Sequence, residues 1–203
     1  MSNYNLLSNE AFISKYLDNQ KDYYSVCIGT RNVDLEKIIA SELSPEEVLE
    51  DENMLKMRTS IIENGWCESE DEDFSDICLT LAPNGKYSIS NGIRRLIIAK
   101  EMGMERFRAT VEVAIPIKYL DRSDFREIAL VEAQIGELNE KIKAITEQYH
   151  EETAIPKSAN NLINVYCNMC TRQQKKMDTI YQNVALREGL VPRFYFDNKH
   201  ITV

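Results

Sequence analysis

The sequence predicts an α+β domain followed by an α-helical hairpin. Over roughly the first 118 residues, short stretches rich in β-branched and aromatic residues alternate with helical patterns. From about residue 122 onward, apolar residues recur at spacings of three and four in two long segments separated by a short break. This change of pattern predicts two domains, residues 1–118 and residues 119–203.

The first elements are a short helix and a strand. Residues 8–20 form an amphipathic pattern that begins with Ser8, a good N-cap residue. Residues 23–28 are rich in aromatic and β-branched side chains, which predicts a strand. The segment from Gly29 to Asn32 is then expected to form a turn.

A long helix and a β-hairpin are expected next. Ser44-Pro45 is a strong helix start, and the helical pattern continues to Asn64-Gly65, where glycine suits a left-handed C-cap. Residues 77–81 read as a strand, and the turn at residues 83–86 leads into a second strand before Gly92. These elements complete the pattern of an α+β domain.

The junction at Asn91-Gly92 carries the most specific chemical signal. A helix begins directly after it, with Arg94 and Arg95 in the first turn, and a strand is expected over residues 107–115. The start of a helix presents unpaired N–H groups and a partial positive charge, which attract anions. Arginine is unfavourable there for the helix dipole, but its planar donors suit phosphate. The junction therefore predicts a phosphate-bearing ligand.

The C-terminal region predicts two long helices. The first has an unbroken apolar seam. The seam positions are Ile128, Val131, Ile135, Leu138, Ile142, Ile145 and Tyr149. Ile155-Pro156 ends this helix, and Ser158 is expected to cap the second. The second helix is expected to place one set of residues on a common apolar face. They are Leu162, Val165, Met169, Met177, Ile180 and Val184.

The short break between the two helices favours an antiparallel hairpin, and a homodimeric coiled coil is the alternative. Residues 122–190 are therefore also a candidate surface for a homodimer or a protein partner. Gly189 and Pro192 end the second helix, and residues 193–203 are expected to form two short strands.

Composition bounds the function. The chain has 203 residues, with 33 acidic and 24 basic side chains and a net charge of −9. This negative charge does not favour DNA binding, because the phosphates of DNA require a basic surface. No apolar run is long enough to span a membrane, and the first residues do not resemble a secretory signal. Five scattered cysteines fit reduced thiols, so we expect a cytoplasmic protein.

No metal site is predicted. Cys167-Asn168-Met169-Cys170 lacks the second ligand pair that structural zinc needs. The acidic run over residues 68–76 lacks the alternating ligands of a calcium loop, so a solvated loop is expected.

Three pieces of residues 24–115 resemble, in order, the N-terminal nuclease/CTPase-type domain of the ParB/sulfiredoxin superfamily. Residues 33–38 look like the opening strand and loop, and residues 60–65 resemble a helix end before a strand. Residues 91–99 resemble the Gly-x-Arg-Arg box with its trailing helix, and this piece is the specific one. The resemblance implies a small mixed sheet with helices, and a nucleotide-binding protein of a bacterial, plasmid or phage system that handles DNA.

The resemblance also implies particular ligand contacts. In such proteins the box binds the phosphates of a nucleoside triphosphate, CTP or ATP, with Mg²⁺ possible. Carried over, it makes Gly92, Arg94 and Arg95, together with the adjacent Asn91, phosphate-binding residues, with Arg58 as a further basic candidate. The chain departs from the family pattern in three ways. Ile93 and Arg94 stand where sulfiredoxins carry a cysteine and a histidine. Residues 40–60 contain no clean match to the earlier Gln-x-Arg phosphate contact of ParB proteins, and the sequence shows no helix-turn-helix region of the kind that partition proteins use to bind DNA.

Three alternatives stay open. A phosphotransferase or nucleotide hydrolase would need a general base, for which Asp34 and Glu36 are the candidates. The chain could instead act as a protein-interaction module without ligand chemistry. Finally, Arg94 and Arg95 could be surface residues paired with acidic neighbours such as Glu101 or Glu105.

Overall fold

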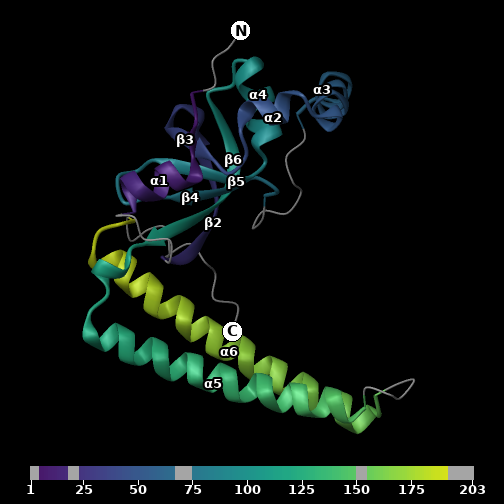
Figure 1. Ribbon diagram of the computed structural model, residues 1–203, viewed down its shortest axis with the longest axis vertical. Helices are drawn as coiled ribbons and strands as arrows, with labels where there is room; N and C mark the ends of the chain where they lie inside the picture. Colours follow the sequence, from purple (N-terminus) through teal and green to yellow (C-terminus); the bar gives the residue numbers. More distant parts are fainter. Residues whose placement is uncertain (1–4, 18–22, 67–74, 150–154, 192–203) are drawn as a thin grey trace. The chain divides into compact units, whose positions relative to one another are not determined.

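The computed structural model describes residues 5–17, 23–66, 75–149 and 155–191 (Figure 1). Contacts within the chain divide it into two compact units. Among the described residues, one unit runs to Ile117 and also takes residues 189–191, and the other is Lys118–Glu188. The predicted boundary after residue 118 lies one residue from this division, but residues 189–191 group with the first unit instead of the hairpin.

The first unit contains a six-stranded mixed sheet, with strand order β1-β3-β5-β4-β6-β2 (Figure 1). The strands are β1 (Leu7–Ser8), β2 (Tyr24–Asp34), β3 (Ile38–Ser41), β4 (Cys78–Leu81), β5 (Tyr87–Asn91) and β6 (Arg106–Ile115). β5 lies between β3, to which it is parallel, and β4, to which it is antiparallel. β6 is parallel to β4 and antiparallel to β2.

Four α-helices accompany the sheet. They are α1 (Asn9–Tyr16), α2 (Pro45–Leu49), α3 (Glu52–Asn64) and α4 (Ile93–Glu101). A 3-10 turn, Leu35–Lys37, connects β2 to β3. The Oγ of Ser8 accepts a hydrogen bond from the N–H of Ala11 at 3.2 Å, so the predicted N-cap of the first helix is confirmed. The predicted α+β class is confirmed as well.

α4 is the helix most deeply packed in this unit. One set of its side chains is buried, and it comprises Ile93, Leu96, Ile97, Ile98 and Ala99. Leu79 of β4, Ile89 of β5 and Val111 of β6 are each at most 1% exposed. Burial of apolar side chains from a helix and neighbouring strands is the main stabilising contribution to such a unit.

The expected turn at Gly29 to Asn32 is wrong, because β2 continues through it. Cys27 pairs with Glu112 and Thr30 with Thr110, so the register of β2 on β6 shifts between the two pairs. Gly29, with φ of 76°, lies at this β-bulge. A glycine with positive φ allows the extra residue to be accommodated without ending the strand.

The single helix expected from Ser44-Pro45 to Asn64-Gly65 is also wrong. Ser44 does cap a helix, since its Oγ accepts from the N–H of Glu46, but α2 ends at Leu49. α3 begins at Glu52, because the Asp51 side chain accepts from the N–H of Asn53 at 2.9 Å. An aspartate N-cap competes with helical continuation, which explains the break.

The second unit is an antiparallel helical hairpin of α5 (Arg122–Gln148) and α6 (Lys157–Arg187). The hairpin was predicted and is confirmed, and the seam residues Ile128, Val131 and Leu138 of α5 are buried. α6 begins at Lys157, with Pro156 at the N-cap position and no capping side chain, so the expected cap at Ser158 is wrong. The fixed φ of Pro156 suits the start of a helix, so the chain becomes helical before it reaches Ser158.

One part of the expected apolar face of α6 is wrong. Met177, Ile180 and Val184 are buried, whereas Leu162, Val165 and Met169 are 42%, 51% and 41% exposed. In the N-terminal half of α6, Ile163, Tyr166 and Cys170 are half-buried instead, each one position further along the chain than an exposed residue of the expected face. The stripe of Leu162, Val165 and Met169, named the distal stripe below, is therefore turned away from the seam.

The expected strands at residues 193–203 and most of the acidic run at residues 68–76 lie outside the described residues. In the portion of the chain that the structure describes, no helix combines the length and apolar character required to cross a membrane.

An ion-pair network fastens the open end of the hairpin. Arg187 Nη2 donates to Asp124 Oδ2 at 2.7 Å and to the carbonyl oxygen of Tyr119 at 2.9 Å. Nη1 of Arg187 lies 3.3 Å from Asp121 Oδ2. The hydrogen bond from Arg187 lowers the pKa of Asp124 below its ordinary value. Arg187 thus links the C-terminal end of α6 to the N-terminal end of α5.

We expect Arg187→Ala to lower the midpoint of thermal unfolding by about 2–4 °C, the shift for a loss of about 1 kcal/mol in a chain of this size. Because the folded-state pKa of Asp124 is lowered, its contribution is present above the unfolded pKa and is lost as pH falls through the folded pKa. The difference between variant and wild type should therefore shrink in acid. Arg172→Ala on the exposed side of α6 is the control, and an equal loss there would contradict the network.

Candidate functional site

Gly92 forms the junction between β5 and α4. It is the N-cap residue of α4, with φ of 95°, in the left-handed region. A Cβ at this position would lie 3.0 Å from Cγ1 and 3.2 Å from Cα of Ile77. Both the backbone conformation and the space beside Ile77 therefore require glycine. No side chain among the described residues caps α4, so the N–H groups of its first turn are left for other acceptors.

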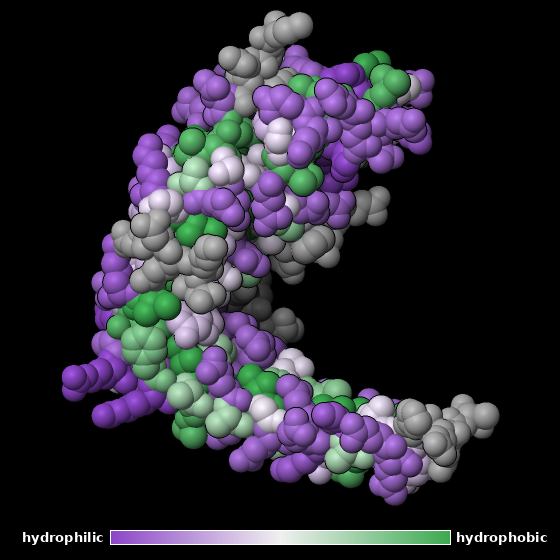
Figure 2. Space-filling view, in the orientation of Figure 1, coloured by the Kyte–Doolittle hydropathy of each residue, from purple (hydrophilic) through white to green (hydrophobic). Residues whose placement is uncertain are grey.

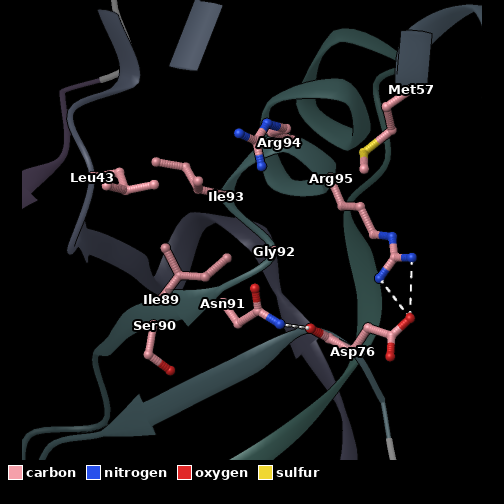
Figure 3. A pocket seen from close by; sticks show the side chains of 10 residues that line it. All are labelled: Leu43, Met57, Asp76, Ile89, Ser90, Asn91, Gly92, Ile93, Arg94 and Arg95. Atoms are coloured by element: carbon pink, nitrogen blue, oxygen red, sulfur yellow. Dashed lines mark hydrogen bonds and ion pairs between the residues drawn. The ribbon is translucent and has the colours of Figure 1, made fainter. Parts of the chain in front are cut away.

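A cavity of about 230 Å³ opens at this junction (Figure 3). Four of the five predicted phosphate-binding residues line it, namely Asn91, Gly92, Arg94 and Arg95. Its other lining residues are Leu43, Met57, Asp76, Ile89, Ser90 and Ile93. The cavity therefore combines the start of a helix, two guanidinium groups and one carboxylate.

Arg95 is paired with Asp76 (Figure 3). Its Nη1 and Nη2 donate to Oδ2 of Asp76 at 3.1 and 3.2 Å. The Asn91 side chain donates from Nδ2 to the backbone carbonyl oxygen of Asp76 at 2.7 Å. The side chain of Asp76 is 62% exposed, so water reaches this ion pair and screens it.

Arg94 is paired with Asp51, the residue that caps α3. Nη2 of Arg94 donates to Oδ2 of Asp51, whose side chain is 25% exposed. The N–H of Asn53 and then the Arg94 guanidinium hold the pKa of Asp51 below its ordinary value. Nε of Arg94 is buried and has no hydrogen-bond partner among the described residues. One donor of this ion pair is therefore left unsatisfied among the described residues.

The arginines do have acidic partners, but the partners differ from the expected Glu101 or Glu105. Glu101 is instead paired with Arg58, which donates hydrogen bonds of 3.0 Å from Nε and 2.8 Å from Nη2 to the Glu101 carboxylate. Arg58 was the fifth predicted phosphate-binding residue, and it does not line the cavity beside Gly92. The structure thus brings four of the candidates together and leaves Arg58 in a separate ion pair.

A second cavity, of about 460 Å³, adjoins the first. The two share Met57 and Arg95 as lining residues. Trp66 lines the second cavity, and its ring is stacked on Phe107 with 6.4 Å between centroids. Small-molecule sites are commonly between about 300 and 1,000 Å³, so the second cavity gives room for more than a phosphate.

Sequence reasoning missed the two carboxylates, Asp51 and Asp76. A signal for Asp51 was present, because aspartate is one of the preferred N-cap residues. It was hidden by the apolar spacing that continues from Val48 to Leu55. Asp76 offered no comparable signal, since it ends a long run of acidic residues.

The proposed catalytic pair, Asp34 and Glu36, lines a different pocket of about 490 Å³. Asp34 lies 2.7 Å from Lys37 Nζ and 2.5 Å from Arg106 Nε. The hydrogen bonds from Lys37 and then Arg106 lower the pKa of Asp34, which makes it a weaker base. No residue of this pocket lines the cavity beside Gly92, so the two candidate general bases and the two arginines border different cavities.

Within the described ranges, no three metal-binding side chains lie together. Cys167 and Cys170 are both free thiols, and Cys170 donates to the Asn139 side chain at 3.8 Å.

Comparisons with known proteins give one structural likeness. No family model matches the chain, and no curated protein matches it significantly. Among solved structures, the chain is similar to the C-terminally truncated chromosome-partitioning protein ParB from Caulobacter crescentus, complexed with CTP-γ-S. The two are 19% identical, with a TM-score of 0.31, over 66% of this chain and 70% of that one. A likeness at this level does not identify a ligand for this chain.

We expect Gly92→Ala to destabilise the fold more than Gly85→Ala. Both glycines have positive φ, 95° and 79°, which costs an alanine about 1–2 kcal/mol at either position. Only at Gly92 would the new Cβ also meet Ile77, whereas nothing lies within 4 Å at Gly85. Urea unfolding measures both variants, and equal losses of stability would show that the close approach to Ile77 is not a constraint.

Proposed function

We propose that the chain is a ParB-like regulatory protein that binds the phosphates of a nucleoside triphosphate, CTP or ATP, at the junction of β5 and α4. The supporting observation is that the uncapped first turn of α4 and the guanidinium groups of Arg94 and Arg95 line one cavity. The resemblance of residues 91–99 to the Gly-x-Arg-Arg box agrees with this proposal. The proposed setting is a bacterial, plasmid or phage system that handles DNA.

Each residue has a defined part in the proposed binding. Gly92 has no side chain, so a phosphate can approach the backbone N–H groups of the first turn. Arg94 offers the Nη2 group that now binds Asp51, and Arg95 offers two Nη groups that now bind Asp76. Charged hydrogen bonds from guanidinium groups to phosphate are stronger than neutral ones. The larger adjoining cavity would take the rest of the nucleotide.

Mg²⁺ fits the site only as a companion of the ligand. The described residues hold no cluster of three carboxylates, cysteines or histidines. Mg²⁺ is commonly held by one or two carboxylates together with substrate phosphates and water. Asp76, at the rim of the cavity and 62% exposed, is the carboxylate that could serve in this way.

We expect a nucleoside triphosphate with Mg²⁺ to raise the midpoint of thermal unfolding, because a ligand that binds only the folded state stabilises it. Arg94→Ala and Arg95→Ala should each abolish the shift. A panel of the four ribonucleoside triphosphates at millimolar concentration makes the measurement.

Two controls sharpen this test. Arg172→Ala removes an exposed arginine from the hairpin and should leave the shift intact. Arg58→Ala tests the fifth candidate, and the pairing of Arg58 with Glu101 leads us to expect a smaller effect than at Arg94. The absence of a shift with every triphosphate would refute the proposal.

A second candidate function is a protein interface on the hairpin. The distal stripe places three apolar side chains at spacings of three and four on the solvent side of α6. The same side of α6 continues through Lys176 and Thr179, which border a groove of about 370 Å³ against Leu130 of α5. Figure 2 shows hydrophobic residues interspersed with hydrophilic ones along the surface of the hairpin. A two-helix hairpin commonly buries such a stripe in a four-helix bundle, which a homodimer would supply.

We expect wild-type protein to sediment as a dimer and Val165→Glu to sediment as a monomer, because a charge at the centre of an apolar interface is costly to bury. Gln174→Glu, which adds the same charge at an exposed position elsewhere on α6, should leave the dimer intact. A monomeric wild type at every concentration tested would exclude the homodimer.

A further inference from the structure

We infer that Asp51 and Asp76 occupy the anion positions on Arg94 and Arg95, and that this arrangement selects for ligands with at least two linked phosphate groups. The inference rests on the proposed function, because it concerns the selectivity of the same site. Its starting point is that each guanidinium group of the cavity already binds one carboxylate. A ligand must therefore exchange with these carboxylates and cannot simply add to free arginines.

The pair of Arg94 and Asp51 is the more firmly held of the two. Oδ1 of Asp51 accepts from the backbone N–H of Asn53 at 2.9 Å and from its side chain at 3.1 Å. Oδ2 of Asp51 is thereby directed to Arg94, and the side chains of Arg94 and Asp51 are only 34% and 25% exposed. Charged groups that share hydrogen bonds with backbone resist displacement better than a solvent-exposed pair.

The pair of Arg95 and Asp76 is the looser one. Both Nη groups of Arg95 share the single oxygen Oδ2 of Asp76, so the second carboxylate oxygen is left out of the pair. The Asp76 side chain is 62% exposed, and ion pairs of this kind contribute little in water. An incoming phosphate therefore displaces Asp76 first, and it does so at low cost.

Displacing one carboxylate is not enough for tight binding. With both pairs intact, the two positive charges are matched by two negative ones, so the arginines add no net positive charge to the attraction of the helix start. A single phosphate that replaces Asp76 still lies near the Asp51 carboxylate, and like charges repel. A second phosphate linked to the first meets Arg94 at a high effective concentration, which favours exchange with Asp51. Selection for linked phosphates follows from these two steps.

The experiment compares three anions by isothermal titration calorimetry: inorganic phosphate, tripolyphosphate and CTP. Wild-type protein should bind tripolyphosphate and CTP much more tightly than inorganic phosphate. Asp51→Asn and Asp76→Asn should each tighten the binding of inorganic phosphate by roughly fivefold, and so narrow the selectivity. Asparagine is as good an N-cap as aspartate, so Asp51→Asn keeps the start of α3.

Glu101→Gln is the matched control. It removes the same negative charge from the ion pair of Glu101 with Arg58. The side chains of Arg58 and Glu101 are 34% and 33% exposed, so this pair is shielded from solvent about as well as the pair of Arg94 and Asp51. It should leave the affinity for inorganic phosphate unchanged, so an equal gain would assign the effect to overall charge and overturn the inference.

Two further outcomes are distinguishable. If wild-type protein binds CTP through Arg94 but neither asparagine variant gains affinity for phosphate, the inference is wrong and the proposed function stands. If neither the wild type nor the variants bind any of the three anions, the proposed function fails and the inference fails with it.

Discussion

The candidate site depends on the close contact between Gly92 and Ile77. This contact leaves no room for a side chain at residue 92 and lets α4 begin directly at the end of β5. Ile77 itself is fixed, because its carbonyl oxygen accepts from the N–H of Thr110 in β6 at 2.8 Å. Asp76 immediately precedes Ile77, so the same contact brings the Asp76 carboxylate beside Arg95. One steric constraint thus positions the helix start and one of its two counter-ions.

The second counter-ion arises from a different requirement. Arginine in the first turn of a helix is opposed by the helix dipole, and a nearby carboxylate offsets this cost. Asp51 supplies the carboxylate to Arg94 while one of its oxygens caps α3. The cap that separates α2 from α3 therefore also neutralises the start of α4. The effect of a bound anion on Asp51 would reach α3 through this shared residue.

The sequence predicted those parts of the structure that depend on local rules. The Gly92 turn, the cap at Ser8 and the hairpin seam at Ile128, Val131 and Leu138 follow from backbone sterics, capping and periodicity, and the structure has all of them. The register shift at Gly29 could not be predicted from local rules, because it depends on the pairing of β2 with β6, about 80 residues later in the chain.

The missed features of the site have the same origin. Which of the many acidic residues would pair with Arg94 and Arg95 depends on where α3 and the segment before β4 lie, and neither position is encoded near residue 94. The distal stripe was assigned to the seam because Leu162, Val165 and Met169 have the right spacing. The half-buried positions begin one residue later, at Ile163, and a helical period alone does not fix which of two adjacent stripes faces the partner helix.

The direction of the two arginines limits where a shared ligand can lie. Successive residues of an α-helix are about 100° apart around its axis, so Arg94 and Arg95 must diverge. Figure 3 shows them on different sides of α4, with Arg95 directed to Asp76. The buried side chains of Ile93 and Leu96 through Ala99 hold the helix against rotation about its axis. A ligand that touches both guanidinium groups must therefore lie across the end of the helix, against the uncapped N–H groups beside Gly92. Carboxylates from two separate segments can each reach one arginine, but a chain of linked phosphates can reach both.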